Sequence, residues 1–368
     1  MGDVQFYSHS NQPNTMNQKQ NNQIINYFLV IGVIFLGSCK PKSQKATWKV
    51  PSYEMRVMEE STQPLIDQDH PASVGNKRGY EGGTVFRLDG AYHMFVTELI
   101  NDWVRTRTGY WQSRDGVQWE RVKTIMESPD STGGPRNSLW SPMPFYNENE
   151  GRWNLFYVGY ERDGQTHGRI FRAYSSVPGK EGLGGPYVDV PGTVLSYTDP
   201  DRDPWEGSQG AAAFYVYQVG EKWYGFYASG DSRTRWDEGL AVADSLEGEW
   251  KRDDVPNPQL TYGENPIVTQ LDDGTWFCVF DDLAHGESSS TIGYAYSFDG
   301  KHWIQKHLDF PMPSWAINIR TPQSLIPAGE NTWWVYFTAH TPQNFDCTGR
   351  MKVTIEKKFQ KAADNRGS

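Results

Sequence analysis

The sequence has little of what several large classes of protein require. It contains three cysteines in 368 residues, without the His/Cys spacing typical of a metal centre. The formal charge is −10 and no lysine/arginine stripe is present, which argues against a nucleic-acid partner. No apolar run reaches the ~20 residues of a transmembrane helix. Helical periodicity over a dozen residues is not evident either, so a mainly helical protein is excluded.

Aromatic residues, glycine and proline are abundant instead. The chain has 15 Trp, 20 Tyr and 17 Phe, together with 36 Gly and 22 Pro. The aromatic residues lie in short apolar runs with β-branched residues, and the glycines and prolines separate these runs. This composition predicts an all-β protein with many short strands.

The N-terminal segment differs from the rest of the chain. An Asn/Gln-rich stretch precedes a short apolar run at 27–37, and the motif Leu36-Gly37-Ser38-Cys39 follows. The run has the length of a signal-peptide core, and the motif resembles the lipobox of bacterial lipoproteins. That resemblance implies lipidation at Cys39 and a lipid-anchored location in the cell envelope. A plain secretory signal with a chance cysteine is the alternative.

A five-fold repeat dominates the remaining sequence. Each copy has an apolar strand, a polar turn and an aromatic strand, with aromatic leaders about 50–70 residues apart. The aromatic strands begin at Tyr92, Trp153, Trp223, Trp276 and Trp334. Such periods predict a five-bladed β-propeller with enlarged loops. We therefore expect a signal peptide over 1–39, a linker and lead-in over 40–75, the propeller over 76–358 and a tail over 359–368.

The repeat also predicts which residues meet. Inner strands of a propeller surround its axis, so their first residues converge at one opening, here called the mouth. The inner strands are predicted to start near Glu81, Ser141, Glu206, Glu264 and Arg320. Several carboxylates in a partly dry opening repel one another, so at least one should have a raised pKa.

This set of residues favours glycoside hydrolysis. The reaction needs one carboxyl group as an acid and a second as a base or nucleophile. Asp203 precedes Glu206 by three residues. Trp140 and Trp205 offer flat apolar faces to a sugar ring, and a place in the core is the alternative for both. His285, in a loop of the fourth repeat, could also reach the mouth, although a solvated loop histidine is the alternative.

Short motifs resemble the five-bladed propeller glycoside hydrolases. Trp140-Ser141-Pro142 is similar to the Trp-Ala-Pro of family 43, and Trp205-Glu206-Gly207 to the Glu-Gly that carries the general acid there. The segment from Ser245 to Trp250 resembles a blade end of that family. Arg202-Asp203-Pro204 and Glu264-Asn265-Pro266 are similar to motifs of family 32, on later blades than in that family. A propeller fold and a glycosidase activity are what this resemblance implies.

The resemblance covers roughly residues 78–355 and has two departures. Glu81 stands where family 43 has an aspartate base, and Met143 where it has an aspartate that tunes the acid. By this comparison Glu206 is the general acid and Glu81 the base acting through water. Glu264 or Asp203 would tune the acid or hold the sugar.

Arg320 would bind a hydroxyl or carboxylate group, or else tie the fifth repeat to its neighbour. We expect a glycosidase that acts on terminal sugars of a polysaccharide or oligosaccharide, with inversion. A propeller that only binds glycans is one alternative, which the missing aspartate at Met143 favours. A phosphorylase using Arg320, Arg136 and His285 is another. No cofactor is required, and a structural calcium ion, common in such relatives, is left open.

Overall fold

The structure is a computed structural model that describes residues 49–101, 104–129, 134–161, 167–232, 235–252, 255–284 and 289–361. The described residues of Tyr53–Glu356 belong to one compact unit. The outer ends of the first and last strands, 49–52 and 357–361, fall in a second unit. The predicted lipidation site Cys39 and the predicted mouth residue His285 lie outside the described residues.

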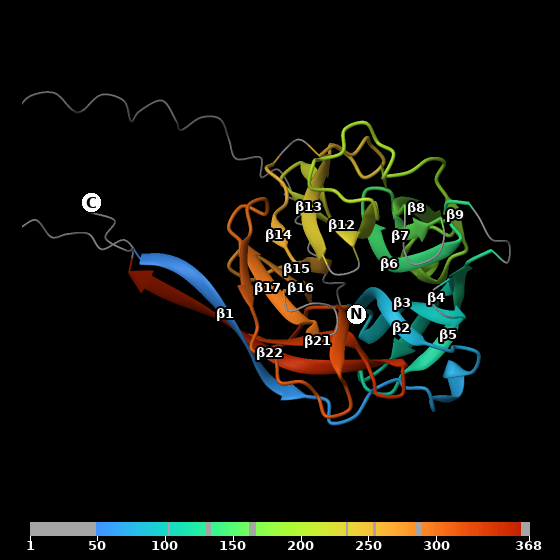
Figure 1. Cartoon of the computed structure of the whole chain (residues 1–368), viewed down its shortest axis with the longest axis horizontal. Helices are drawn as coiled ribbons and strands as arrows, with labels where there is room; N and C mark the ends of the chain where they lie inside the picture. Colours follow the sequence, from blue (N-terminus) through green and yellow to red (C-terminus); the bar gives the residue numbers. More distant parts are fainter. Residues whose placement is uncertain are drawn as a thin grey trace, which may run out of the picture. The chain divides into compact units, whose positions relative to one another are not determined.

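The strands of the described residues form five antiparallel groups (Figure 1). The first is β2 (Gly79–Leu88), β3 (Ala91–Asn101), β4 (Arg105–Ser113) and β5 (Glu120–Glu127). The second is β6 (Ser138–Asn147), β7 (Arg152–Tyr160), β8 (Arg169–Ser175), β9 (Tyr187–Asp189) and β10 (Leu195–Ser196). The third is β11 (Ala211–Val219), β12 (Lys222–Ser232), β13 (Arg235–Ala243) and β14 (Leu260–Thr261).

The fourth group is β15 (Gly263–Gln270), β16 (Trp276–Asp282), β17 (Thr291–Ser297) and β18 (Ile304–His307). The last is β19 (Asn318–Pro322), β20 (Ile326–Gly329), β21 (Thr332–His340), β22 (Asp346–Lys361) and β1 (Lys49–Glu60). Two short 3₁₀ helices, η1 (Pro71–Ser73) and η2 (Lys180–Gly184), interrupt the connections.

The inner strands of the five groups contact one another in a cycle, in the order β2, β6, β11, β15, β19 and back to β2. Gly79 of β2 pairs with Asp346 of β22, which links the first group to the last. The predicted all-β propeller fold is therefore confirmed. Within the segment predicted as linker and lead-in, β1 pairs with β22 as an extra strand of the last sheet. The inward residues Tyr53 and Met55 carry the short alternating pattern that explains this strand.

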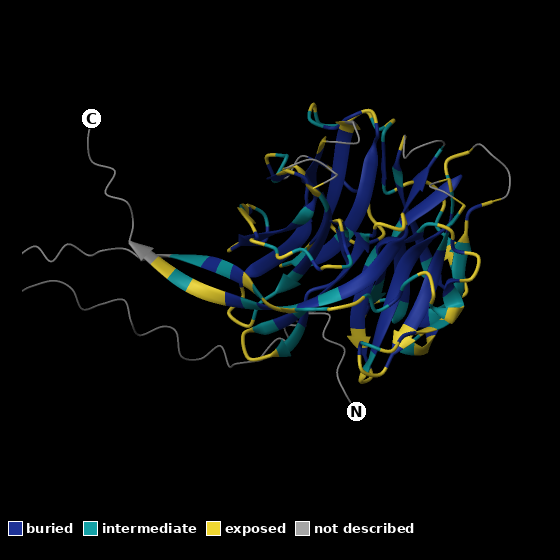
Figure 2. Cartoon of the chain, turned by 60° about the horizontal axis from the view of Figure 1, so that its bottom comes forward, coloured by how far each residue is buried: buried dark blue, intermediate teal, exposed yellow. Residues whose placement is uncertain are grey.

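The aromatic strands are the second strand of each group and lie in the core. Trp153, Phe156 and Tyr157 of β7 are at most 1% exposed, and all seven residues of β16 are buried. Both faces of each such strand pack against neighbouring sheets, which explains the nearly continuous apolar sequence. Figure 2 shows the same distribution, with buried strands and exposed residues concentrated in the turns.

Each inner strand carries a β-bulge near its start. The pairing register shifts after Glu81, Trp140, Ala212, Glu264 and Ile319. In the first four strands the next residue has a positive φ, at Gly82, Ser141, Ala213 and Asn265. These four positions are therefore structurally equivalent. The third one is Ala212 and not Glu206, so the predicted start of the third inner strand is wrong by several residues.

Candidate active site

Antiparallel pairing gathers polar groups at the end of the propeller where the inner strands begin. There, the start of each inner strand lies beside the end of the second strand and the start of the third. Glu264 pairs with Asp281, and Asn318 with His340, which pairs in turn with Asp346. Side chains from three strands of one sheet thereby reach the mouth, although only first-strand residues were predicted there.

Glu81 and Arg320 form an ion pair across the first and last groups. The Arg320 Nη2 atom lies 2.6 Å from Glu81 Oε1, and the two side chains are 18% and 7% exposed. Burial lowers the pKa of Arg320, but the charges of Glu81, Asp346, Asp281 and Glu264 outweigh it and raise the pKa overall. Arg320 therefore stays positively charged beside the Glu81 carboxyl group.

Glu81 and Glu264 share one electrostatic environment. Burial raises the pKa of Tyr160 well above its ordinary value, and the charges of Glu264 and Glu81 raise it further. Arg320 and Asp281 are also influenced by both glutamates. Tyr160, Arg320 and Asp281 lie in three different sheets, and the charges of the same two glutamates act on all three. Glu81, Glu264 and Arg320 therefore lie at one site.

Two buried carboxyl groups surround Glu264. Burial raises the pKa of Glu238 well above the usual range, and the charges of Glu264 and Asp237 add to this effect. Burial also raises the pKa of Asp281, opposed by Arg320 and reinforced by Glu264 and Glu81. Both carboxyl groups therefore bind a proton more readily than an exposed carboxyl group. These raised pKa values occur at residues that were not among the carboxyl groups predicted at the mouth.

The equivalent bulge residues pack closely at the centre of the ring. Ser141 Oγ donates to Asn265 Oδ1 at 3.3 Å, between the second and fourth groups. A Cβ atom on Gly82 would lie 2.9 Å from Ser141 Oγ, so the glycine is required both by its φ of +64° and by this contact. The backbone beside Glu81 and Glu264 is thus held in a defined conformation.

Glu206 lies in a different network. Its side chain is fully buried and ion-pairs with Arg252, whose Nε atom is 2.6 Å from Oε1. Tyr227 and the backbone amide of Asp203 donate to the same oxygen at 2.9 and 3.1 Å. Arg202 Nε lies 3.5 Å from Oε2. A fully buried carboxylate enclosed by these four partners has no free access to a substrate, so the predicted role of Glu206 as general acid is not supported.

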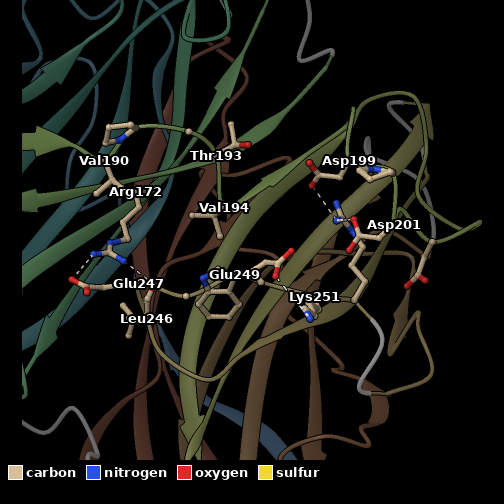
Figure 3. A pocket seen from close by; sticks show the side chains of 17 residues that line it. Arg172, Val190, Thr193, Val194, Asp199, Asp201, Leu246, Glu247, Glu249 and Lys251 are labelled. Carbon is tan, nitrogen blue, oxygen red and sulfur yellow. Dashed lines mark hydrogen bonds and ion pairs between the residues drawn. The ribbon is translucent and has the colours of Figure 1, made fainter.

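Asp203 and Trp205 belong to this second network. Trp205 Nε1 and Asn257 Nδ2 donate to Asp203 Oδ2 at 3.1 and 3.0 Å. The network borders a cavity of about 550 Å³ between the second and third groups (Figure 3). In that cavity Arg252 also pairs with Asp199 at 3.1 Å. These contacts tie the connection between β10 and β11 to the connection between β13 and β14, so Asp203, Trp205 and Glu206 have structural partners there.

Trp140 is in the core as well. It is 3% exposed and packs edge-on against Tyr160, with ring centroids 6.4 Å apart. Of the two alternatives for Trp140, a sugar-facing ring or a core residue, the structure shows the core residue. Of the predicted site residues within the described part of the chain, Glu81, Glu264 and Arg320 are brought together, whereas Asp203, Glu206, Trp140 and Trp205 are not part of this set.

No local signal marks Glu238, Asp281, Tyr160 or His340 as residues of the mouth. Each lies on a second or third strand, inside an apolar stretch whose pattern indicates only burial. Knowledge of the strand register would have identified them, because residues opposite Glu264 and Asn318 must also lie at the mouth.

Neither a metal centre nor a membrane-spanning helix is present in the described part of the chain. No group of three or more His, Cys, Asp or Glu side chains among the described residues is arranged to hold a metal ion. No helix within the same ranges has the length and apolar character to cross a membrane.

Comparison with known proteins supports the fold. No family model matches the sequence, and no curated protein matches it either. The solved structure of a BT0996–RGII complex has a TM-score of 0.65 and 14% identity, over 85% of this chain and 96% of that one. A thermostable family-43 glycoside hydrolase has a TM-score of 0.51 and 15% identity, over 80% and 96%. The catalytic domain of the Coprinopsis cinerea GH62 α-L-arabinofuranosidase has a TM-score of 0.56 and 13% identity, over 81% and 98%.

The chain therefore has the propeller fold found in these glycoside hydrolases. The resemblance inferred from the short motifs is confirmed at the level of the fold, although several of the motifs that suggested it are structural.

Proposed function

We propose that this protein is a glycoside hydrolase that acts on terminal sugars with Glu81 and Glu264 as its two catalytic carboxyl groups. The observation that carries the proposal is the common electrostatic environment of these glutamates, with Arg320 between them. They occupy equivalent bulge positions on β2 and β15, and β19 separates these two strands in the ring.

The surroundings assign different roles to the two glutamates. Glu81 is ion-paired with Arg320, so it is the carboxylate that activates water as the base. Glu264 is half-buried and lies among the carboxyl groups of Glu238, Asp281 and Glu81. Because Glu81 is the glutamate that forms the ion pair with Arg320, we assign Glu264 as the acid that protonates the leaving oxygen.

A substrate panel tests the function. The panel consists of 4-nitrophenyl glycosides, beginning with the α-L-arabinofuranoside because of the structural likeness to the GH62 enzyme, and of plant and algal polysaccharides. The protein is expected to release sugar from at least one member, and the double variant E81Q/E264Q is expected to release none. Binding without release from any bound member would favour a glycan-binding propeller, and turnover that requires phosphate would favour a phosphorylase.

The stereochemical outcome is a separate prediction. Because β19 lies between the strands that carry Glu81 and Glu264, we expect the wide carboxyl separation of about 6.5–9.5 Å that leaves room for water. Proton NMR recorded during the first minutes of hydrolysis should show the sugar with inverted anomeric configuration. Initial release of the retained anomer would instead require a nucleophilic glutamate.

We also propose that Cys39 is lipidated and anchors the protein in the cell envelope. The support is the Leu36-Gly37-Ser38-Cys39 motif after the apolar run. In a bacterial host the wild-type protein should sediment with membranes because acyl chains on Cys39 hold it there. C39A lacks the residue that carries these chains and should not sediment with membranes. Membrane sedimentation of C39A equal to that of wild type would contradict the lipid anchor.

A further inference from the structure

A histidine–aspartate pair lies at the mouth beside the proposed catalytic groups. His340 Nδ1 is 2.5 Å from Asp346 Oδ1, and the side chains are 23% and 1% exposed. His340 ends β21 and pairs with Asn318, two residues before Arg320 on β19. Asp346 begins β22, pairs with Gly79 two residues before Glu81, and raises the pKa of Arg320 through its charge. The pair is thus connected to both members of the Glu81–Arg320 ion pair.

The pair leaves one ring nitrogen available. Asp346 engages Nδ1, and within the described residues no hydrogen bond or ion pair involves Nε2 of His340. The carboxylate that holds the ring is completely buried, so the exposed part of the pair is the imidazole. A histidine fixed at one nitrogen and open at the other is oriented for a ligand.

We propose that His340 binds the substrate through Nε2, which hydrogen-bonds a hydroxyl group of the sugar at the mouth, while Asp346 fixes the ring. A hydroxyl group can both donate and accept, so it suits either protonation state of the imidazole. His340 is then a specificity-determining residue that acts in binding, and Asp346 is a positioning residue. The inference rests on the proposed function, since the sugar site is the one formed by Glu81, Glu264 and Arg320.

Two other histidines provide internal controls. His302 Nδ1 lies 2.7 Å from Asp299 Oδ2, and His307 Nδ1 lies 2.5 Å from Asp282 Oδ2. Both side chains are about 65% exposed. His302 lies in the β17–β18 turn, at the opposite end of its sheet from the mouth, and His307 lies on the outermost strand β18. All three histidines therefore pair with an aspartate through Nδ1. Of the three, only His340 is on a second strand at the mouth.

Sugar protection is the first test. Diethyl pyrocarbonate modifies accessible imidazoles, and peptide mass spectrometry gives the rate at each histidine. In the E81Q/E264Q protein, the glycoside that wild type hydrolyses should slow modification of His340 and leave His302 and His307 unchanged. Equal rates at His340 with and without a bound sugar would overturn the proposal. If no glycoside is hydrolysed, free arabinose and galactose serve as probes, so that a failure of the catalytic proposal is distinguished from a failure of this one.

Kinetics of two substitutions is the second test. H340A should raise KM about 10- to 100-fold with little change in kcat, because a hydrogen bond made in both ground and transition states is lost. H340Q keeps a polar group near the position of Nε2 and should recover part of this loss, while H302A should match wild type. An H340A protein with unchanged KM, or one that loses only kcat, would contradict a binding role.

Discussion

Substitution of Glu264 by glutamine is expected to lower the rate on natural glycosides about 10²- to 10⁴-fold, which is the usual contribution of a general acid. A 4-nitrophenyl glycoside should be affected much less, because its leaving group departs without a proton. The physical reason is that a natural leaving group needs the proton of the acid, and Glu264 lies at the mouth among the buried carboxyl groups of Glu238 and Asp281. Rates on both kinds of substrate, measured at saturation, test this directly.

Substitution of Glu81 should give a different pattern. E81Q removes the carboxylate that forms the ion pair with Arg320 and that we assign as the base, so both kinds of substrate should lose activity to the same extent. Loss on the natural substrate alone would identify Glu81 as the acid and reverse the two roles.

E206Q is the matched control for both variants. Glu206 is as buried as Glu81 but is enclosed by Arg252, Tyr227 and Arg202. Its substitution should lower stability and leave the substrate pattern of wild type in the folded fraction. A well-folded E206Q protein without activity, together with an active E264Q protein, would restore Glu206 as the acid.

The second large effect concerns two buried glutamates that look alike in the sequence. Glu98 is 1% exposed and accepts from Arg107, from Arg121 at 2.9 Å and from Trp111 at 2.8 Å. E98Q leaves two half-buried arginines without their buried counter-charge and should cost about 3–5 kcal/mol of unfolding free energy. Chemical denaturation measures this loss, and a cost below about 1 kcal/mol would mean that solvent replaces the carboxylate.

Glu238 should respond in the opposite sense. Its carboxyl oxygens have no hydrogen-bond partner among the described residues, and burial raises its pKa in the folded state above that of the unfolded chain. The folded protein therefore keeps a proton that the unfolded chain releases. The contribution of Glu238 to the free energy of unfolding is therefore fully present below the ordinary glutamate pKa of about 4.3. This contribution declines as the pH rises above that value.

E238Q is neutral at every pH and removes this decline. The gain in stability of E238Q over wild type should therefore be larger at pH 8 than at pH 4. The Tm values of both proteins at the two pH values measure this difference. An E238Q protein that is destabilised more at pH 8 than at pH 4 would show that Glu238 is ionised and paired in the folded state.

Local patterns were sufficient for the main features of the fold. Alternating apolar strands, Asp-Gly turns and a repeated aromatic strand depend on interactions a few residues apart, so one sequence predicts them. The same logic identified Glu81, Glu264 and Arg320, because they begin strands that the repeat already marked. It failed at Glu206, since a long connection of 197–210 separates β10 from β11 and no local signal marks where the inner strand begins.

The amino-acid sequence by itself thus determined the all-β propeller, its repeated strands and three of the residues at its mouth. Only the tertiary structure decided that Glu206 is paired with Arg252 and that Glu238, Asp281 and the His340–Asp346 pair lie at the mouth. The reason is that burial and charge pairing depend on strand register and on contacts between sheets, which join residues that are far apart in the chain.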